Sequence, residues 1–441
     1  MAGVVICTTF AVAALGVEQN SALGGAGSSG AIESFWRTAG WLAAVLAGGA
    51  AAHVAIRRWA PNSNEILFGL IGLLMGIGWV FVARVDASLA SEQAVTVLLG
   101  FAAIAATLVA APRLDWLLKR PGVCGFFAVA LLAAGSFSGG ADPSAGAYEP
   151  PRQWLNLGSL SVQPYGLAKL AVILAACALT VCAPRWLPVR VVPHRHTAGA
   201  IVAAVGAWTL LIAGGDIASS VVIFVAAWLP LWLDGDDHLE TGLPTVARTV
   251  RTRALGGIAA TYGIGVVVLA SVYDWLSAQL RHWQNPWTAT DGAATVESAF
   301  AISAGGLSGV GPGLGAPDRI AAAHSDFVFA VITEELGILG GAAILAALML
   351  FVGVGAGIAQ RAYGTHRLLA ATATVVVGLQ AFLTIAGVLR LLPHTVGALP
   401  FVAHGPAAMV GNCIAVGMLL AISSVSDVSR GEPQQLAQGD S

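Results

Sequence analysis

The ionisable residues best suited to chemistry lie in one segment, at the entrance of a long apolar run. The segment reads His324-Ser-Asp-Phe-Val-Phe-Ala-Val-Ile-Thr-Glu-Glu-Leu-Gly337. Its three carboxylates, Asp326, Glu334 and Glu335, are followed by more than twenty residues without a charge. Because a carboxylate in or beside lipid is costly, it commonly marks a ligand, ion or proton site. We therefore take this segment as the first candidate site.

The composition is that of an integral membrane protein. Of the 441 residues, 57% are hydrophobic and 10% are charged, and the mean hydropathy is +0.80, whereas about 25% of residues are charged in soluble domains. Apolar runs of about 20 residues, the length that spans a bilayer, recur along the chain. We expect one all-α transmembrane domain over 1–425 and a disordered, cytoplasmic tail over 426–441. The expected spans, about twelve, lie near 1–17, 38–56, 66–83, 93–111, 122–138, 163–183, 198–214, 217–233, 254–273, 335–358, 368–392 and 406–423.

The first expected span is short and could instead be a signal peptide, although no basic residue precedes it. If the N-terminus is cytoplasmic, fourteen basic residues fall in cytoplasmic segments and five in external ones. This asymmetry is the one that the positive-inside rule predicts. We therefore expect both termini in the cytoplasm. The largest external loop is 274–325, and its three tryptophans predict that it is ordered at the membrane interface.

Ionisable groups within the spans are predicted to gather in the outer half of the membrane. At 1.5 Å per helical residue, Lys169 lies ~9 Å inside its helix, and Glu334 and Glu335 lie ~12–14 Å below Asp326. Such groups are less costly around an aqueous cavity, which would open outward. In a helix that starts at Asp326, Glu334 is ~80° and Glu335 ~180° around the axis. The two glutamates therefore cannot both share one face of the cavity with Asp326 unless Gly337, Gly340 and Gly341 permit a bend. We expect Glu334 to pair with a basic group such as Lys169, and Glu335 to cap or hydrogen-bond a neighbouring helix.

Each candidate also has a structural alternative. Asp326 could cap the helix that follows it. Lys169 and Arg390 could extend their charged ends to the membrane surface. Arg152 could anchor its helix at the interface, and Asp216 could only stabilise a Gly-Gly-Asp turn.

Metal and nucleic-acid binding are not indicated. His324 and the other external histidines lack the i, i+4 spacing of paired helical ligands, and the five cysteines lack metal spacing. We expect no metal-binding residues, and the use of a divalent cation stays open. The net charge of −2 says little about partners, and we expect no nucleic acid among them.

Five patches resemble, in the same order, motifs of the SEDS family (shape, elongation, division and sporulation), which includes FtsW and RodA. The segment from His324 resembles "HTDFIFAVIAEELGLLG" at nearly every position. The other four are Arg152-Gln-Trp-Leu-Asn-Leu-Gly-Ser-Leu-Ser-Val-Gln-Pro-Tyr-Gly-Leu-Ala-Lys169 beside "RxWLxLG…QPSExAK", Gly215-Asp216 beside "xPDLGT", Asn285-Pro-Trp-Thr-Ala-Thr-Asp-Gly292 beside "NPWxDPxGxGYQ", and Leu399-Pro-Phe-Val-Ala-His-Gly-Pro-Ala-Ala-Met-Val-Gly-Asn412 beside "LPFVSYGGSSLLAN". The likeness covers about 35–425, and twelve spans resemble the branch with two N-terminal helices added to a core of ten.

The resemblance implies a peptidoglycan glycosyltransferase of the bacterial cytoplasmic membrane. Such an enzyme polymerises lipid II, a sugar carried on undecaprenyl pyrophosphate, together with a class B penicillin-binding protein, in elongation, division or sporulation. Asp326 matches the essential aspartate and would take the proton of the attacking hydroxyl. Lys169 and Arg152 would stand beside the leaving pyrophosphate. The remaining candidates for substrate binding are Asp216, Glu334, Arg390, Gln163 and His324.

The chain also departs from the family pattern. Tyr165-Gly166 replaces Ser-Glu, so Lys169 needs another partner, and Ala403-His-Gly-Pro-Ala-Ala408 replaces "SYGGSS". These losses predict an accessory polymerase or a weakened paralogue. Two other classes stay open. One is a flippase or transporter of lipid-linked precursors, although the inverted repeats common in such folds are not found. The other is a non-catalytic protein that scaffolds a penicillin-binding protein.

Overall fold

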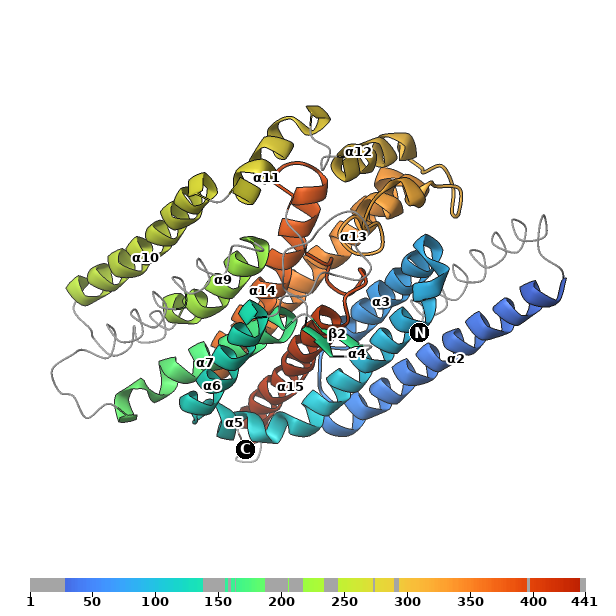
Figure 1. Cartoon of the computed structure of the whole chain (residues 1–441). Helices are drawn as coiled ribbons and strands as arrows, with labels where there is room; N and C mark the ends of the chain where they lie inside the picture. The colour runs from blue at the N-terminus through green and yellow to red at the C-terminus, as the bar shows by residue number, and fades with distance from the viewer. Residues whose placement is uncertain are drawn as a thin grey trace.

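The structure, a computed structural model, is a bundle of helices that run in broadly similar directions (Figure 1). It describes residues 28–137, 155–157, 160–162, 164–186, 205, 217–233, 245–272, 274–288, 293–394 and 397–436. Two short antiparallel strands, β1 (Leu155–Leu157) and β2 (Leu160–Val162), precede helix α7. The helices are α2 (Ser28–Trp59), α3 (Glu65–Val85), α4 (Ala90–Ala110), α5 (Leu114–Leu118), α6 (Pro121–Phe137), α7 (Tyr165–Trp186), α9 (Ile217–Leu233), α10 (Thr245–Val272), α11 (Asp274–Gln284), α12 (Ala293–Gly305), α13 (Val328–Arg361), α14 (Gly364–Val388) and α15 (Pro406–Leu436).

The prediction of a multi-pass, all-helical membrane protein is confirmed. Six described helices are long and apolar enough to cross a membrane, and α6, α7, α9 and α10 contain shorter apolar helices. Ten of the expected spans each correspond to a described helix. The other two, 1–17 and 198–214, lie outside the described residues apart from residue 205. Helix α15 continues to Leu436, into the polar stretch expected to form a tail.

The centre of the bundle is one apolar core built around α15, which packs against α4, α7, α13 and α14. Small residues let these elements approach closely. A Cβ at Gly78 of α3 would lie 2.3 Å from the Val402 carbonyl oxygen. At one edge of the bundle, α10 lies beside α9 (Figure 1). The rings of Phe224 on α9 and Tyr262 on α10 stack on each other. The core therefore holds in place the segments that precede α13 and α15.

The described part of the segment between α10 and α13 is ordered, as expected, and much of it is helical. After α11 and α12, a glycine-rich stretch over 305–315 folds back onto α13. The N–H of Val310 donates to the Glu334 carbonyl at 3.0 Å, and the N–H of Gly311 donates to the Glu335 carbonyl at 3.1 Å. In return, the N–H of Ile338 donates to the Gly306 carbonyl at 2.9 Å.

These exchanged hydrogen bonds exist because α13 is broken at Gly337, where φ is 73° and ψ is −178°. This region of backbone conformation is essentially restricted to glycine. A Cβ at this position would also lie 2.3 Å from the Leu307 carbonyl oxygen. The bend considered from the sequence is therefore present, and it turns backbone groups of α13 toward the glycine-rich stretch.

Candidate active site

Asp326 lies in a tight turn immediately before α13 and is 6% exposed. The N–H groups of Ser325 and Asp326 both donate to the Ala322 carbonyl at 3.1 Å, and Ala322 has a positive φ of 56°. Helix α13 begins at Val328 with Phe327 at the N-cap position. The helical phase predicted from Asp326 was therefore wrong, because Asp326 precedes the helix. The structural alternative for Asp326 was that it caps α13. Phe327, and not Asp326, occupies the N-cap position.

His324 is also buried and joins this turn to the segment before α15. Its carbonyl accepts the N–H of His404 at 3.0 Å, and the two rings meet edge to face at 5.9 Å between centroids. The Nδ1 atom of His404 lies 2.9 Å from Oε1 of Gln93 on α4. His404 occupies the position of the tyrosine in the family pattern, so this departure from the family contributes to the surroundings of the Asp326 turn.

Two titratable groups near the turn lie outside the spanning helices. Hydrogen bonds from Ser88 hold the pKa of Asp86 below its usual value. The ring of His394 stacks on Phe327 at 4.3 Å, and burial lowers the pKa of His394 to about 4. His394 is therefore neutral near pH 7, and it presents an apolar face to the residue that follows Asp326.

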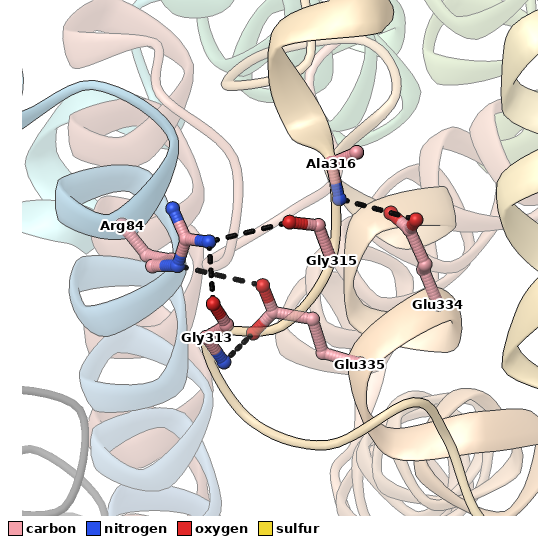
Figure 2. Close-up of polar contacts among 6 residues, drawn as sticks. All are labelled: Arg84, Gly313, Gly315, Ala316, Glu334 and Glu335. Carbon is pink, nitrogen blue, oxygen red and sulfur yellow. Dashed lines mark hydrogen bonds and ion pairs between the residues drawn. The ribbon is translucent and has the colours of Figure 1, made fainter. Parts of the chain in front are cut away.

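Glu335 forms the centre of a buried polar cluster that links α3, the glycine-rich stretch and α13 (Figure 2). Its Oε1 lies 3.5 Å from Nε of Arg84, and its Oε2 accepts the N–H of Gly313 at 2.8 Å. The guanidinium Nη2 of Arg84 donates to the carbonyls of Gly313 at 2.8 Å and Gly315 at 3.3 Å. We call these four residues the Glu335 cluster. The Glu335 carboxylate is thus compensated by the Arg84 guanidinium and by the backbone N–H of Gly313.

The prediction that Glu334 pairs with a basic group was wrong, because Arg84 of the neighbouring helix α3 pairs with Glu335 instead. Glu334 accepts the N–H of Ala316 at 3.2 Å through Oε1, as Figure 2 shows. Its Oε2 is buried without a hydrogen-bond partner among the described residues. It is Glu335 that pairs with a basic group. The break at Gly337 and the return of the glycine-rich stretch bring both carboxylates to the same loop.

Lys169, on α7, is 4% exposed and does not pair with Glu334. Its Nζ donates to Oε1 of Gln380 on α14 and to Oδ1 of Asn412 on α15, both at 2.6 Å. The Nε2 of Gln380 in turn donates to the Ala398 carbonyl at 2.9 Å. We call Lys169, Gln380 and Asn412 the Lys169 cradle. Burial also argues against the alternative in which Lys169 reaches the membrane surface.

A cavity of about 50 Å³ lies beside Lys169, between α7, α9, α14 and the segment before α15. Its polar lining comes from Lys169, Tyr165, Ser219, Gln380 and Thr384, together with the backbone of small residues. A single water needs roughly 10–15 Å³ of such space. The cavity therefore has room for a group of several heavy atoms next to a buried ammonium.

Arg390 has a role in holding the loop. Its Nη2 donates to the Trp283 carbonyl at 3.1 Å, and Nε1 of Trp283 donates to the Arg390 carbonyl at 2.9 Å. This reciprocal pair ties the turn after α14 to α11. The half-buried Arg390 side chain is thus held by the protein itself, and its assignment to substrate binding stays a prediction.

Three other predicted residues, Arg152, Gln163 and Asp216, lie outside the described residues. Conversely, Arg84, Gln380 and Asn412 were not singled out from the sequence. The signal for Gln380 was available, since it is a lone amide in the apolar middle of α14. Asn412 was present in a matched motif but was given no role. Among the described residues, no group of three or more His, Cys, Asp or Glu side chains could hold a metal ion.

The fold and these clusters define a multi-pass helical membrane protein that buries ionisable side chains between its helices. The chain belongs to the FtsW, RodA and SpoVE family, because the model of this family, described as cell cycle protein, matches residues 64–427. The resemblance noted in the sequence is thereby confirmed.

Curated relatives and solved structures agree with this membership. The peptidoglycan glycosyltransferase RodA of Mycobacterium tuberculosis is 27% identical over 401 residues, covering 84% of this chain and 80% of that protein. The probable peptidoglycan glycosyltransferase FtsW of Nitrosococcus halophilus is 27% identical over 383 residues, covering 82% and 92%. Among structures, a chain described under "Structural coordination of polymerization and crosslinking by a peptidoglycan synthase complex" matches with a TM-score of 0.61 at 20% identity, covering 82% and 98%. The crystal structure of Thermus thermophilus RodA matches at 0.54 and 20%, covering 82% and 96%, and both likenesses concern the fold alone.

Proposed function

We propose that this chain is a peptidoglycan glycosyltransferase that polymerises lipid II at the outer face of the bacterial cytoplasmic membrane. The observation that carries the proposal is the buried carboxylate of Asp326. It lies in the segment from His324, which matches the family's aspartate motif at nearly every position. The names of the curated relatives support the same activity. Both termini would then lie in the cytoplasm.

The reaction assigns each group a task. A sugar hydroxyl of one glycan attacks the anomeric carbon of a lipid-linked sugar, and a C–O bond forms. Asp326 takes the hydroxyl proton as general base. The bond to the pyrophosphate oxygen breaks, and undecaprenyl pyrophosphate leaves with the electron pair. A nearby cation stabilises the charge on that leaving group; Lys169 is our candidate, with Arg152 outside the described residues.

A class B penicillin-binding protein is the partner that we propose, with a role in elongation, division or sporulation. Support comes from the likeness of fold to a chain of a complex whose title names polymerization and crosslinking. A transpeptidase would link the strands that this chain makes. Use of a divalent cation stays a prediction.

The test is polymerisation of labelled lipid II by the purified full chain, with and without a candidate transpeptidase and with and without EDTA. Asp326→Asn and Asp326→Ala are expected to lower the polymerisation rate by at least ~10²-fold, the lower range for general acid–base catalysis. Asp318→Asn is the matched control, since Asp318 lies exposed in the same segment. It should polymerise as the wild type does.

Unchanged rate and product length in the Asp326 variants would contradict the proposal. Transbilayer movement of labelled lipid II without polymer would indicate a flippase instead. A wild-type chain that is inactive alone and in the complex, yet still binds the transpeptidase after Asp326→Ala, would indicate a scaffold.

A further inference from the structure

The buried ammonium of Lys169 is surrounded by neutral groups in the described part of the chain. Two of its three N–H donors are used by amide oxygens, those of Gln380 and Asn412. No described residue that lines the adjacent cavity is Asp or Glu. Amide oxygens accept hydrogen bonds from a cation, but they carry no charge that neutralises it. Among the described residues, the cradle therefore leaves one N–H of Lys169 without an acceptor and supplies no opposite charge.

The orientation of the Gln380 amide is fixed by a hydrogen bond on the side away from Lys169. The Nε2 of Gln380 donates to the Ala398 carbonyl at 2.9 Å, so its Oε1 must face Lys169. The Nδ2 of Asn412 is buried and has no hydrogen-bond partner among the described residues. Asn412 is only 1% exposed and does not line the cavity, so it holds Lys169 from behind. The two residues thus position the ammonium without competing for its open side.

Two glycines bring Asn412 to Lys169. A Cβ at Gly166 of α7 would lie 2.7 Å from the Ala407 carbonyl carbon, and one at Gly411 of α15 would lie 2.3 Å from the Gly166 carbonyl oxygen. Helices α7 and α15 can therefore touch only where both residues lack side chains. Because this contact leaves no room for a side chain at 166, it also excludes a carboxylate from the position three residues before Lys169.

We propose that the Lys169 cradle is a positioning device for an anion-binding site, and that Gln380 and Asn412 hold the ammonium uncompensated so that the cavity binds a phosphate group of the substrate. The choice of a phosphate-bearing lipid rests on the proposed function. The size of the cavity fits a group of several heavy atoms. A phosphate oxygen would accept the remaining N–H of Lys169 as a charge-assisted hydrogen bond.

Two isosteric variants of Asn412 separate this role from a purely structural one. Asn412→Asp replaces the unpaired Nδ2 with an oxygen and adds a carboxylate beside Lys169, whereas Asn412→Leu removes an acceptor but adds no charge. We would measure the Kd for undecaprenyl pyrophosphate in nanodiscs, with uncharged undecaprenol and inorganic pyrophosphate as further arms. Asn64→Asp is the control, because it adds the same charge at a distant helix cap that an aspartate also satisfies.

Asn412→Asp is expected to weaken binding of undecaprenyl pyrophosphate at least about tenfold, which corresponds to ~1.4 kcal/mol, while its Tm stays at or above that of the wild type. Asn412→Leu should change binding less. A purely structural cradle predicts the reverse order, since the aspartate would strengthen the contact to Lys169, and that order would overturn the proposal. Binding of undecaprenol that equals binding of the pyrophosphate would also overturn it.

The two pyrophosphate arms identify the source of the anion. If inorganic pyrophosphate binds and responds to Asn412→Asp, the site recognises the free anion as well as the lipid. If only the lipid form responds, the headgroup is recognised together with its chain. Either result supports the proposal. A chain that binds the pyrophosphate in this manner but makes no polymer would contradict the proposed function and leave the anion site supported. Normal polymerisation with an unaltered Kd in Asn412→Asp would contradict the anion site and leave the proposed function supported.

Discussion

The Glu335 cluster and the Lys169 cradle are two buried charged groups that the same bundle treats in opposite ways. The carboxylate of Glu335 meets Arg84 at 3.5 Å and the Gly313 N–H at 2.8 Å. Among the described residues, the ammonium of Lys169 meets the oxygens of two amides, at 2.6 Å each. One charge is matched by an opposite charge, and the other is hydrogen-bonded but not neutralised within the described residues.

The difference indicates different uses. Removing one partner of a buried ion pair leaves the other partner uncompensated, so such a pair becomes necessary for stability once it is present. A charge held by neutral amides still costs desolvation, and an anionic ligand can offset that cost. We therefore expect the Glu335 cluster to support the fold and the Lys169 cradle to support binding.

The largest effect on stability is expected from Gly337→Ala, which should undo the geometry on which the Glu335 cluster depends. A non-glycine residue with this φ and ψ costs on the order of 1–3 kcal/mol, and the new Cβ would meet the backbone of Leu307. We expect a total loss of at least about 3 kcal/mol, seen as a much lower Tm in detergent. Gly353→Ala, in the same helix with open space around it, should leave the Tm unchanged or slightly higher. If Gly337→Ala and Gly353→Ala have the same Tm, the break of α13 at Gly337 does not require a glycine.

Glu335→Ala should come next, because it leaves Arg84 and the Gly313 N–H without their acceptor. The expected loss of stability is about 2–4 kcal/mol. Thermal unfolding in detergent measures the loss, with Glu92→Ala as control, since Glu92 is 68% exposed and surface carboxylates contribute little. If both variants unfold at the same temperature, the Glu335 cluster does not stabilise the fold.

Arg84→Lys tests whether the fork of the guanidinium matters beyond its charge. The variant keeps the ion pair but loses hydrogen bonds to the Gly313 and Gly315 carbonyls, so we expect a loss of about 1–2 kcal/mol. Arg319→Lys, at an exposed position in the same segment, is the control. Limited proteolysis within 305–316 should become faster in Arg84→Lys alone, and equal cleavage rates would argue that charge is sufficient.

Lys169→Met should have the smallest effect on stability. Two hydrogen bonds are lost, but the cost of burying a charge is removed as well, so we expect a change within about 1 kcal/mol. Polymerisation should nevertheless fall at least about tenfold, the effect of one charge-assisted contact in a leaving-group site. A drop in Tm as large as that of Glu335→Ala would erase the distinction between the two clusters.

Several parts of the fold and the site were predictable because they depend on local sequence. Apolar runs gave the spans, and the tryptophans indicated an ordered segment before α13. Gly337, Gly340 and Gly341 were named together as residues that permit a bend, and the break lies at the first of them. Asp326 was singled out by its place beside lipid and by its motif. The basic partner predicted for Glu334 was wrong, because the phase argument assumed an unbroken helix starting at Asp326.

The sequence by itself therefore determined the class of this protein, its spans and the set of residues that carry charge into the membrane. These follow from hydrophobicity and helix length, which act within about 20 residues. Only the tertiary structure decided which charges meet. Lys169 hydrogen-bonds Gln380 and Asn412 at sequence separations of 211 and 243 residues. The contact with Asn412 depends on the close crossing of α7 and α15 at Gly166 and Gly411. Pairing across such distances depends on how the helices pack, and packing is a property of the whole bundle.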